Sequence, residues 1–251
     1  MRTTLFVING SHPCVTVEQA LHLKGVPFRR IELLPGGQLL MRLGFKGRTV
    51  PAIRFEDGER VQGSRAILHA LEERSAEPAL YGGAEIEEAE RWGDETYQSV
   101  PRSILWPALS GRPEVLHAFQ AGSTMPKLPL PVIRAIAPPI VALERRLNAT
   151  SDERAEATIA ELPALLDHVD ALIAAGVLNG DAPNAADLQI APTTRLLLAF
   201  ADLRPLITGR PAEAHARRWL APMEAEAPAG SLPASWIPTA GGAAAAEPVA
   251  G

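Results

Sequence analysis

The first part of the chain combines short apolar runs with a segment of helical periodicity. Residues 5–8 (LFVI) form a continuous apolar run, which is typical of a strand covered on both faces. Residues 9–11 (NGS) interrupt this run with turn chemistry, and Val17, Ala20 and Leu21 then recur at helical spacing. A glycine and a proline shortly afterwards provide a helix stop. The pattern predicts a buried strand, a turn and a helix.

Further strands and helices are expected up to residue 78. The Asp57-Gly58 pair predicts the turn of a β-hairpin, and Ser64 is placed to cap a helix. The expected segments are a strand at 28–33, a short helix or loop at 38–45, hairpin strands at 52–55 and 60–62, and a helix at 64–74. This order predicts an α/β domain.

The second half of the chain has helical periodicity. Residues 140–148, 152–175 and 185–200 predict helices, and an acidic start near residue 85 suits a helix N-terminus. Many prolines and glycines between residues 110 and 139 favour short helices and loops there. The second half is therefore expected to be all-helical.

Composition and charge exclude several kinds of protein. With 251 residues the chain is long enough for two modest domains. A net charge of −5 gives no overall attraction to nucleic acid or to a membrane surface. The single cysteine excludes an intramolecular disulfide and multi-cysteine metal sites, and the histidines lack metal-ligand spacing, so no metal is expected. Without a signal-like or membrane-spanning apolar run, we expect a soluble, cytoplasmic protein.

Three chemically active residues, Ser11, His12 and Cys14, lie where the first strand is expected to meet its helix. Unpartnered N–H groups and the positive end of the helix dipole favour an anion at this position, including a thiolate. We therefore expect the pKa of Cys14 to be lowered. Ser11 has an alternative role as a helix cap. His12 is expected to be exposed in the turn, with tuning of the Cys14 thiol or of the substrate as the alternative.

Three later segments make this arrangement more specific. Residues 49–52 (TVPA) begin a strand, residues 60–67 (RVQGSRAI) lead into a helix, and residues 184–188 (NAADL) contain a capping-box variant. In their order and spacing, over roughly residues 3–205, these segments resemble the soluble glutathione transferase superfamily. The resemblance implies an α/β thioredoxin-like domain followed by an all-α helical-bundle domain.

The expected boundaries follow from this resemblance and from composition. Residues 1–78 are expected to form the thioredoxin-like glutathione-binding domain, residues 79–84 the linker, and residues 85–222 the all-α C-terminal domain. Residues 223–251 are rich in Ala, Pro and Gly, can bury little apolar surface, and are expected to be flexible.

The resemblance implies two candidate catalytic residues. Ser11 matches the family position whose side chain donates a hydrogen bond to the glutathione thiolate, with plain helix capping as the alternative. Cys14 matches the second position of a degenerate redox motif, where it would act as a nucleophile in disulfide exchange. A small residue packed under the strand is the alternative role for Cys14.

Glutathione binding is implied for Val50, Pro51, Gln62 and Ser64. The Val50–Pro51 bond is expected to be cis, which turns the Val50 backbone towards the ligand. Ser64 matches the serine that binds the γ-glutamyl carboxylate from a helix N-terminus. The family normally has Glu or Gln before this serine, whereas this chain has Gly63, with Gln62 one place early.

Charged and aromatic side chains complete the expected site. Three cations are expected either to pair with glutathione carboxylates or to remain as solvated surface charges: Lys46, Arg48 and Arg65. Trp92, Tyr97 and Trp106 are expected to line the electrophile pocket, with a role in the helical core as the alternative.

The function implied by the resemblance is transfer of glutathione, as co-substrate, to a small apolar electrophile, in a homodimer. Two alternatives remain. One is a thiol transferase or deglutathionylase that depends on Cys14. The other is a catalytically silent module of the same fold that binds a ligand or a partner.

Overall fold

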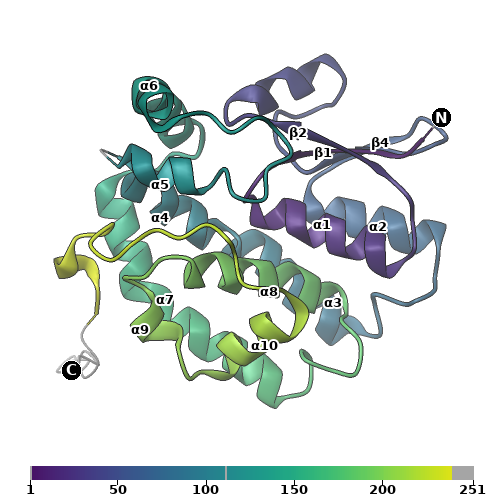
Figure 1. Cartoon of the computed structure of the whole chain (residues 1–251). Helices are drawn as coiled ribbons and strands as arrows, with labels where there is room; N and C mark the ends of the chain where they lie inside the picture. Colours follow the sequence, from purple (N-terminus) through teal and green to yellow (C-terminus); the bar gives the residue numbers. More distant parts are fainter. Residues whose placement is uncertain (1, 111, 239–251) are drawn as a thin grey trace, which may run out of the picture.

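The computed structural model describes residues 2–110 and 112–238, which form a small sheet domain followed by a larger helical part (Figure 1). The first domain contains β1 (Thr4–Ile8), α1 (His12–Leu23), β2 (Arg29–Leu33), η1 (Gly37–Leu43), β3 (Ala52–Arg54), β4 (Arg60–Gln62) and α2 (Ser64–Arg74). The helical part contains α3 (Ala84–Trp92), η2 (Gly93–Tyr97), α4 (Ser99–Leu109), α5 (Pro113–Ala118), α6 (Leu130–Leu147), α7 (Asp152–Ala174), α8 (Ala185–Leu198), α9 (Arg204–Ile207), α10 (Pro211–Trp219) and η3 (Ala234–Trp236).

The sheet is mixed, with the strand order β2-β1-β3-β4. β1 runs parallel to β2 and antiparallel to β3, and β3 and β4 form the predicted hairpin. Leu5 and Val7 of the central β1 are fully buried, as expected for an apolar strand covered by helices. α1 and α2 cover the face of the sheet that is turned towards the helical part (Figure 1). The predicted thioredoxin-like domain followed by helices is confirmed.

Helix α8 connects the cores of the two parts. Its residues Ala185 and Leu188 pack among the side chains of β1, α1 and α2. Ile190 and Leu197 of the same helix belong to the core of the helical part, where the fully buried Phe200 also lies. α8 is buried along nearly its whole length, so it fixes how the two parts meet.

The predicted capping box at the start of α8 is present and is extended by a histidine. The Asn184 side chain accepts the Asp187 N–H, and the Asp187 carboxylate accepts the Asn184 N–H. The same carboxylate accepts the Asn179 N–H at 2.8 Å and lies 2.7 Å from His215 Nε2 on α10. Asp187 and His215 are both fully buried, so this carboxylate joins α8, the loop before it and α10.

Helix α6 differs from the expected loops and short helices between residues 110 and 139. It begins at Leu130 and continues through Pro138 and Pro139. Two prolines remove two N–H donors and would ordinarily interrupt a helix. Arg134 and Ala135, whose carbonyl groups would have accepted those donors, are exposed, as are both prolines. Water can therefore satisfy these carbonyl groups, and the helix continues.

Part of the segment expected to be a flexible tail is packed on the helical part. Ala227 pairs with the backbone of Phe200, and Ala225, Ala227 and Leu232 are buried. Asp202 accepts the N–H groups of Gly230 and Leu232. Composition alone does not predict this packing, and residues 239–251 of the expected tail lie outside the described residues. Within the part of the chain that the structure describes, no helix is both long and apolar enough to cross a membrane.

Replacing Asp187 tests the role of the extended capping box. Asp187→Ala should lower the free energy of unfolding by about 2–4 kcal/mol, because it removes a helix cap and leaves buried donors unpaired. Urea denaturation measures this loss. Asp181→Ala, at an exposed position in the preceding loop, is the control and should leave the unfolding midpoint unchanged. Equal midpoints for the two variants would contradict the assigned role.

Candidate functional site

A pocket of about 360 Å³ lies between the first domain and helices α4, α5 and α6. Five of the candidate catalytic, glutathione-binding and electrophile-pocket residues line it together: Ser11, Val50, Pro51, Ser64 and Trp106. The β1–α1 turn, the loop before β3 and the start of α2 supply the first four, and α4 supplies the tryptophan. The topology thus brings together segments that are far apart in sequence.

Ser11 occupies the N-cap position of α1, with extended backbone angles. Among the described residues, its side chain accepts no hydrogen bond from the N–H groups of the helix. The Ser11 side chain therefore does not cap α1, which was the alternative role expected for it. Ser11 lines the pocket, beside the positive end of a twelve-residue helix.

Cys14 does not have the environment of a reactive thiol. Its side chain is 2% exposed and packs in the core under the sheet, away from the pocket lining. Burial raises the pKa of Cys14 to about 12, and contacts with Ser11 and the Ile8 backbone offset only part of this rise. The expected lowering of the pKa by the helix N-terminus is therefore wrong, because desolvation is the larger effect.

His12 is buried, and the expectation of an exposed loop histidine is wrong. It is 4% exposed, and its Nε2 donates to the Gln98 carbonyl oxygen at 2.9 Å. Burial, followed by the positive charge of Arg102, lowers the pKa of His12 to about 3. The ring is therefore neutral at pH 7 and joins the start of α1 to the start of α4.

The Val50–Pro51 peptide bond is cis, as predicted. Both residues line the pocket, and Gly63 donates its N–H to the Pro51 carbonyl oxygen at 3.0 Å. Within the described residues, the N–H and carbonyl groups of Val50 have no hydrogen-bond partner. An extended peptide lying in the pocket can therefore pair with the Val50 backbone.

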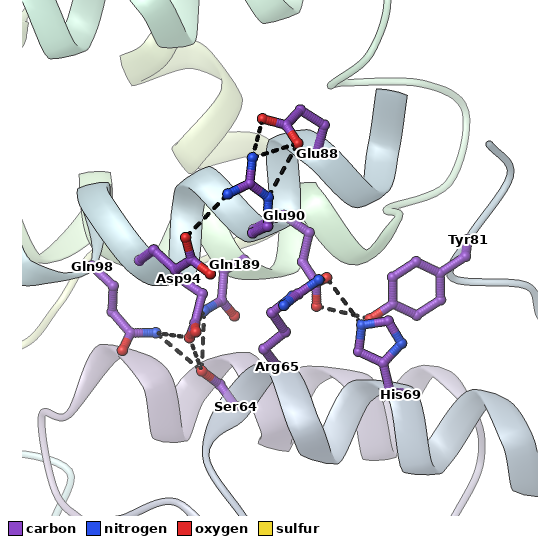
Figure 2. Close-up of polar contacts among 11 residues, drawn as sticks. Ser64, Arg65, His69, Tyr81, Glu88, Glu90, Asp94, Gln98 and Gln189 are labelled. Carbon is purple, nitrogen blue, oxygen red and sulfur yellow. Dashed lines mark hydrogen bonds and ion pairs between the residues drawn. The ribbon is translucent and has the colours of Figure 1, made fainter. Parts of the chain in front are cut away.

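Ser64 lies at the first turn of α2 and is bonded to residues from two other helices (Figure 2). Its hydroxyl accepts hydrogen bonds from Gln98 Nε2 at 3.0 Å and from Gln189 Nε2 at 3.1 Å, and it donates to Asp94 Oδ1 at 3.3 Å. The preceding Gly63 has φ +96°, a backbone conformation that favours glycine. Ser64 is thus buried at the pocket wall, with its hydroxyl already bonded within the protein.

Gln62 does not reach the pocket. Its amide oxygen accepts the Gly47 N–H at 2.8 Å, and its amide nitrogen donates to the Thr49 carbonyl oxygen at 2.6 Å. The side chain therefore holds the loop that carries Val50. In this structure Gln62 is not placed to contact glutathione directly, as was expected, because both ends of its amide are bonded to that loop.

Arg65 also has a partner within the protein. The buried Glu90 of α3 accepts hydrogen bonds from Arg65 Nε at 3.1 Å and from the Tyr81 hydroxyl at 2.8 Å, and His69 lies 3.4 Å away (Figure 2). Burial raises the pKa of Glu90, and the bonds from Tyr81 and Arg65 offset part of the rise. This cluster joins α2 to α3, while Arg48 lies at the pocket and is exposed.

Two of the three aromatic residues expected at the electrophile pocket lie elsewhere. Tyr97 is fully buried, bonds through its hydroxyl to Thr194, and stacks on Trp92 with ring centroids 5.2 Å apart. Trp92 also contacts His168 of α7. Both belong to the helical core, because they face α7 and α8, whereas Trp106 lines the pocket.

The segment from α5 to α6 closes the pocket over the first domain through three sets of polar contacts. Asn9 Nδ2 donates to the carbonyl oxygens of residues 119 and 121, each at 2.9 Å. Glu32 accepts from the Ser123 hydroxyl and from Thr124, and Glu144 of α6 accepts from the N–H of residue 36 and the side chain of residue 38. Local sequence patterns do not predict these contacts, because each joins residues about 90 to 110 positions apart.

Comparison with known families identifies the first domain. Residues 5–79 match the family model described as glutathione S-transferase, N-terminal domain. A comparison with curated protein sequences gives no match. The matched residues include β1, α1, the cis-proline loop and α2, so they contain all the pocket residues of the first domain that the sequence singled out.

Solved structures extend the likeness to most of the chain. A glutathione S-transferase from Sinorhizobium meliloti is 15% identical, with a TM-score of 0.56 and coverage of 87% of this chain and 86% of that one. One from Methylobacterium radiotolerans, in complex with glutathione sulfonate, is 20% identical, with a TM-score of 0.51 and coverage of 93% and 95%. A maleylacetoacetate isomerase from Anaeromyxobacter dehalogenans, with glutathione bound in its active site, is 19% identical, with a TM-score of 0.52 and coverage of 87% and 89%.

The chain thus has the fold of the glutathione transferase superfamily, and its residues 5–79 match the N-terminal domain family of glutathione S-transferases. The resemblance found in the sequence is confirmed.

The environment of Cys14 gives a direct test, because it is the only cysteine in the chain. With its pKa raised to about 12, the thiol should react with Ellman's reagent at pH 8 far more slowly in the folded protein than in urea. We expect the rates to differ by about 100-fold or more, as the thiolate fraction and access both fall. Equal rates would show that Cys14 is accessible and ionised.

Proposed function

We propose that this protein binds glutathione in the pocket between its two parts and transfers it to a second, largely apolar substrate. The observation that supports this most is the convergence of Ser11, the cis Val50–Pro51 peptide and the start of α2 on one pocket. The solved relatives that hold glutathione or glutathione sulfonate have the same fold.

Ser11 would stabilise the glutathione thiolate. Its hydroxyl would donate a hydrogen bond to the sulfur, and the positive end of α1 would favour the negative charge. Both effects lower the pKa of the bound thiol, which raises the concentration of the nucleophile. The backbone of Val50 would pair with the cysteinyl residue and hold the sulfur next to Ser11.

The γ-glutamyl group of glutathione would lie against Ser64 and Asp94. Its carboxylate would accept hydrogen bonds from the first turn of α2, and its ammonium group would pair with the Asp94 carboxylate. Gln98 and Gln189 now donate to the same hydroxyl and carboxylate oxygens, so they would have to release at least one of these bonds. Binding of glutathione would therefore include a local exchange of hydrogen bonds.

The far wall of the pocket suits an apolar second substrate. Apolar side chains from α4, α5 and α6 form it, including Leu105, Trp106, Leu116, Ile133 and Ile136. Such a wall would exclude water from the electrophile and hold the electrophile near the sulfur. Catalysis would then come from the proximity of the two reactants. A homodimer and a cytoplasmic location accompany this proposal, and sedimentation of the purified chain tests the former.

A second candidate function is ligand binding without turnover. The Ser64 hydroxyl is saturated by Gln98, Gln189 and Asp94, and Gly63 offers no side chain where the family has Glu or Gln. These two features favour weak recognition of the γ-glutamyl group. A binding module would retain apolar ligands in the pocket but show no glutathione-dependent reaction. Transfer through Cys14 has no such support, because its thiol is buried and its pKa is raised.

Replacing Ser11 tests the proposed mechanism. Ser11→Ala should slow conjugation of glutathione to an aryl halide by about 10- to 100-fold, because a charge-assisted hydrogen bond is worth about 1.5–3 kcal/mol. The pH profile of kcat/KM should shift upwards with the pKa of the bound thiol.

The matched control is Ser99→Ala on α4, whose hydroxyl bonds to the Thr96 carbonyl oxygen outside the pocket. It should retain wild-type rates. An unchanged rate and pH profile in Ser11→Ala would remove Ser11 from the mechanism. No turnover by the wild type, combined with binding of apolar ligands, would favour the second candidate.

A further inference from the structure

An arginine lies within the otherwise apolar face that α4 turns to the pocket. Arg102 lines the pocket and lies three and four positions before Leu105 and Trp106, which line it too. Residues at this spacing share one face of a helix. Gln98, one turn earlier on the same face, bonds to Ser64. Arg102 is therefore placed between the polar end of the pocket and its apolar wall.

The guanidinium group of Arg102 has no acidic partner within the described residues. One terminal nitrogen donates to the Gln98 amide oxygen, which is a neutral acceptor. Its Nε is buried and has no hydrogen-bond partner in the described part of the chain. Burial lowers the pKa of Arg102, although arginine remains charged at neutral pH. A partly buried charge with an unused donor is costly unless an anion pairs with it.

The carboxylates that line the pocket are already engaged elsewhere. Glu32 bonds to Arg30, Ser123 and Thr124, and Glu144 bonds to residues 36, 38 and 148. Asp94 accepts from Gln189 at 2.8 Å and favours the charged form of Arg102 without forming a salt bridge with it. No pocket carboxylate among the described residues neutralises Arg102 directly, so an anion supplied by a ligand can pair with it.

Arg102 lines the same pocket as Ser11 and His12. Its positive charge contributes to the lowered pKa of His12, the residue next to Ser11 in the chain. An anionic group bound at Arg102 would thus lie near the atom that glutathione attacks, with the rest of the molecule against Leu105 and Trp106.

We propose that the second substrate is an apolar electrophile that carries a carboxylate or a similar anionic group near its reacting carbon, and that Arg102 binds this group. The proposal rests on the proposed function and names its substrate class. Arg102 then acts as a specificity-determining residue.

The test compares 4-chloro-3-nitrobenzoate with its methyl ester, which differ in charge but share the leaving group. In both reactions the carbon–sulfur bond forms, chloride leaves with the electron pair of the carbon–chlorine bond, and the thiol proton passes to water. Each kcat/KM is divided by the rate constant without protein, which removes the difference in intrinsic reactivity. The test variants are Arg102→Gln and Arg102→Lys. The control is Arg48→Gln, because Arg48 is a second cation that lines the pocket but is exposed.

We expect the wild type to prefer the acid over the ester by about 10- to 100-fold, as for a charge-assisted hydrogen bond. Arg102→Gln should lose this preference with the KM for glutathione unchanged, Arg102→Lys should regain part of it, and Arg48→Gln should keep it. A wild type with no preference for the acid would overturn the proposal. So would a preference that survives in Arg102→Gln, or an Arg102→Gln variant that raises the KM for glutathione and slows both electrophiles equally.

Binding without glutathione separates this proposal from the proposed function. If no conjugation occurs with either compound, the proposed function fails, and calorimetry then decides the fate of the anion site. Binding of 4-chloro-3-nitrobenzoate that is lost in Arg102→Gln would support an anion site at Arg102. Equal binding by the two proteins, or none by the wild type, would overturn it.

Discussion

The arrangement of the pocket depends on the burial of helix α8 between two cores. Ala185 and Leu188 pack under the sheet, and Ile190 and Leu197 pack in the helical part. A buried helix must have its first N–H groups satisfied, since water does not reach them. The Asn184 side chain accepts the N–H of Asp187, and the Asp187 carboxylate accepts the N–H of Asn184 and also bonds to His215. Because α8 cannot shift without exposing both cores, the two walls of the pocket are held at a fixed separation.

Polar contacts then decide which charges remain available in the pocket. Most buried polar groups there are paired across long stretches of sequence, such as Glu144 with Gln38. His12 is kept neutral by burial, and Cys14 is kept protonated in the same way. For a histidine with a depressed pKa, the unfolded chain binds the extra proton between about pH 3 and 6.5. The free energy of unfolding therefore rises with pH across that window, and above it this histidine no longer makes the stability depend on pH. Among the described residues, the partly buried charge of Arg102 has no acidic partner.

Local patterns in the sequence predict the first domain well. The apolar run at β1 and the Asp57-Gly58 turn each have a local cause, whereas the cis Val50–Pro51 bond is implied by the family resemblance; the structure contains all three. Ser11 and Ser64 are likewise found at the pocket, because the ends of two secondary-structure elements fix their positions. The capping box of α8 is predicted for the same reason.

What the sequence did not reveal depends on contacts between distant segments. Trp92 and Tyr97 have the residue type expected in a ligand pocket, but the packing of α7 and α8 decides that they face the core. Desolvation of Cys14 outweighs the helix dipole, and its extent is known only once the fold is complete. Arg102 has no distinguishing local pattern, since its importance comes from the absence of an acid near it among the described residues.

A crystal structure obtained with saturating glutathione tests the central claim most directly. The account predicts the γ-glutamyl carboxylate at Ser64 and the start of α2, the cysteinyl backbone paired with Val50, and the sulfur within hydrogen-bond distance of the Ser11 hydroxyl. It also predicts that Gln98 or Gln189 releases a bond to Ser64. Glutathione bound elsewhere, or a pocket without glutathione in which Ser64 keeps its bonds to Gln98, Gln189 and Asp94, would contradict the account.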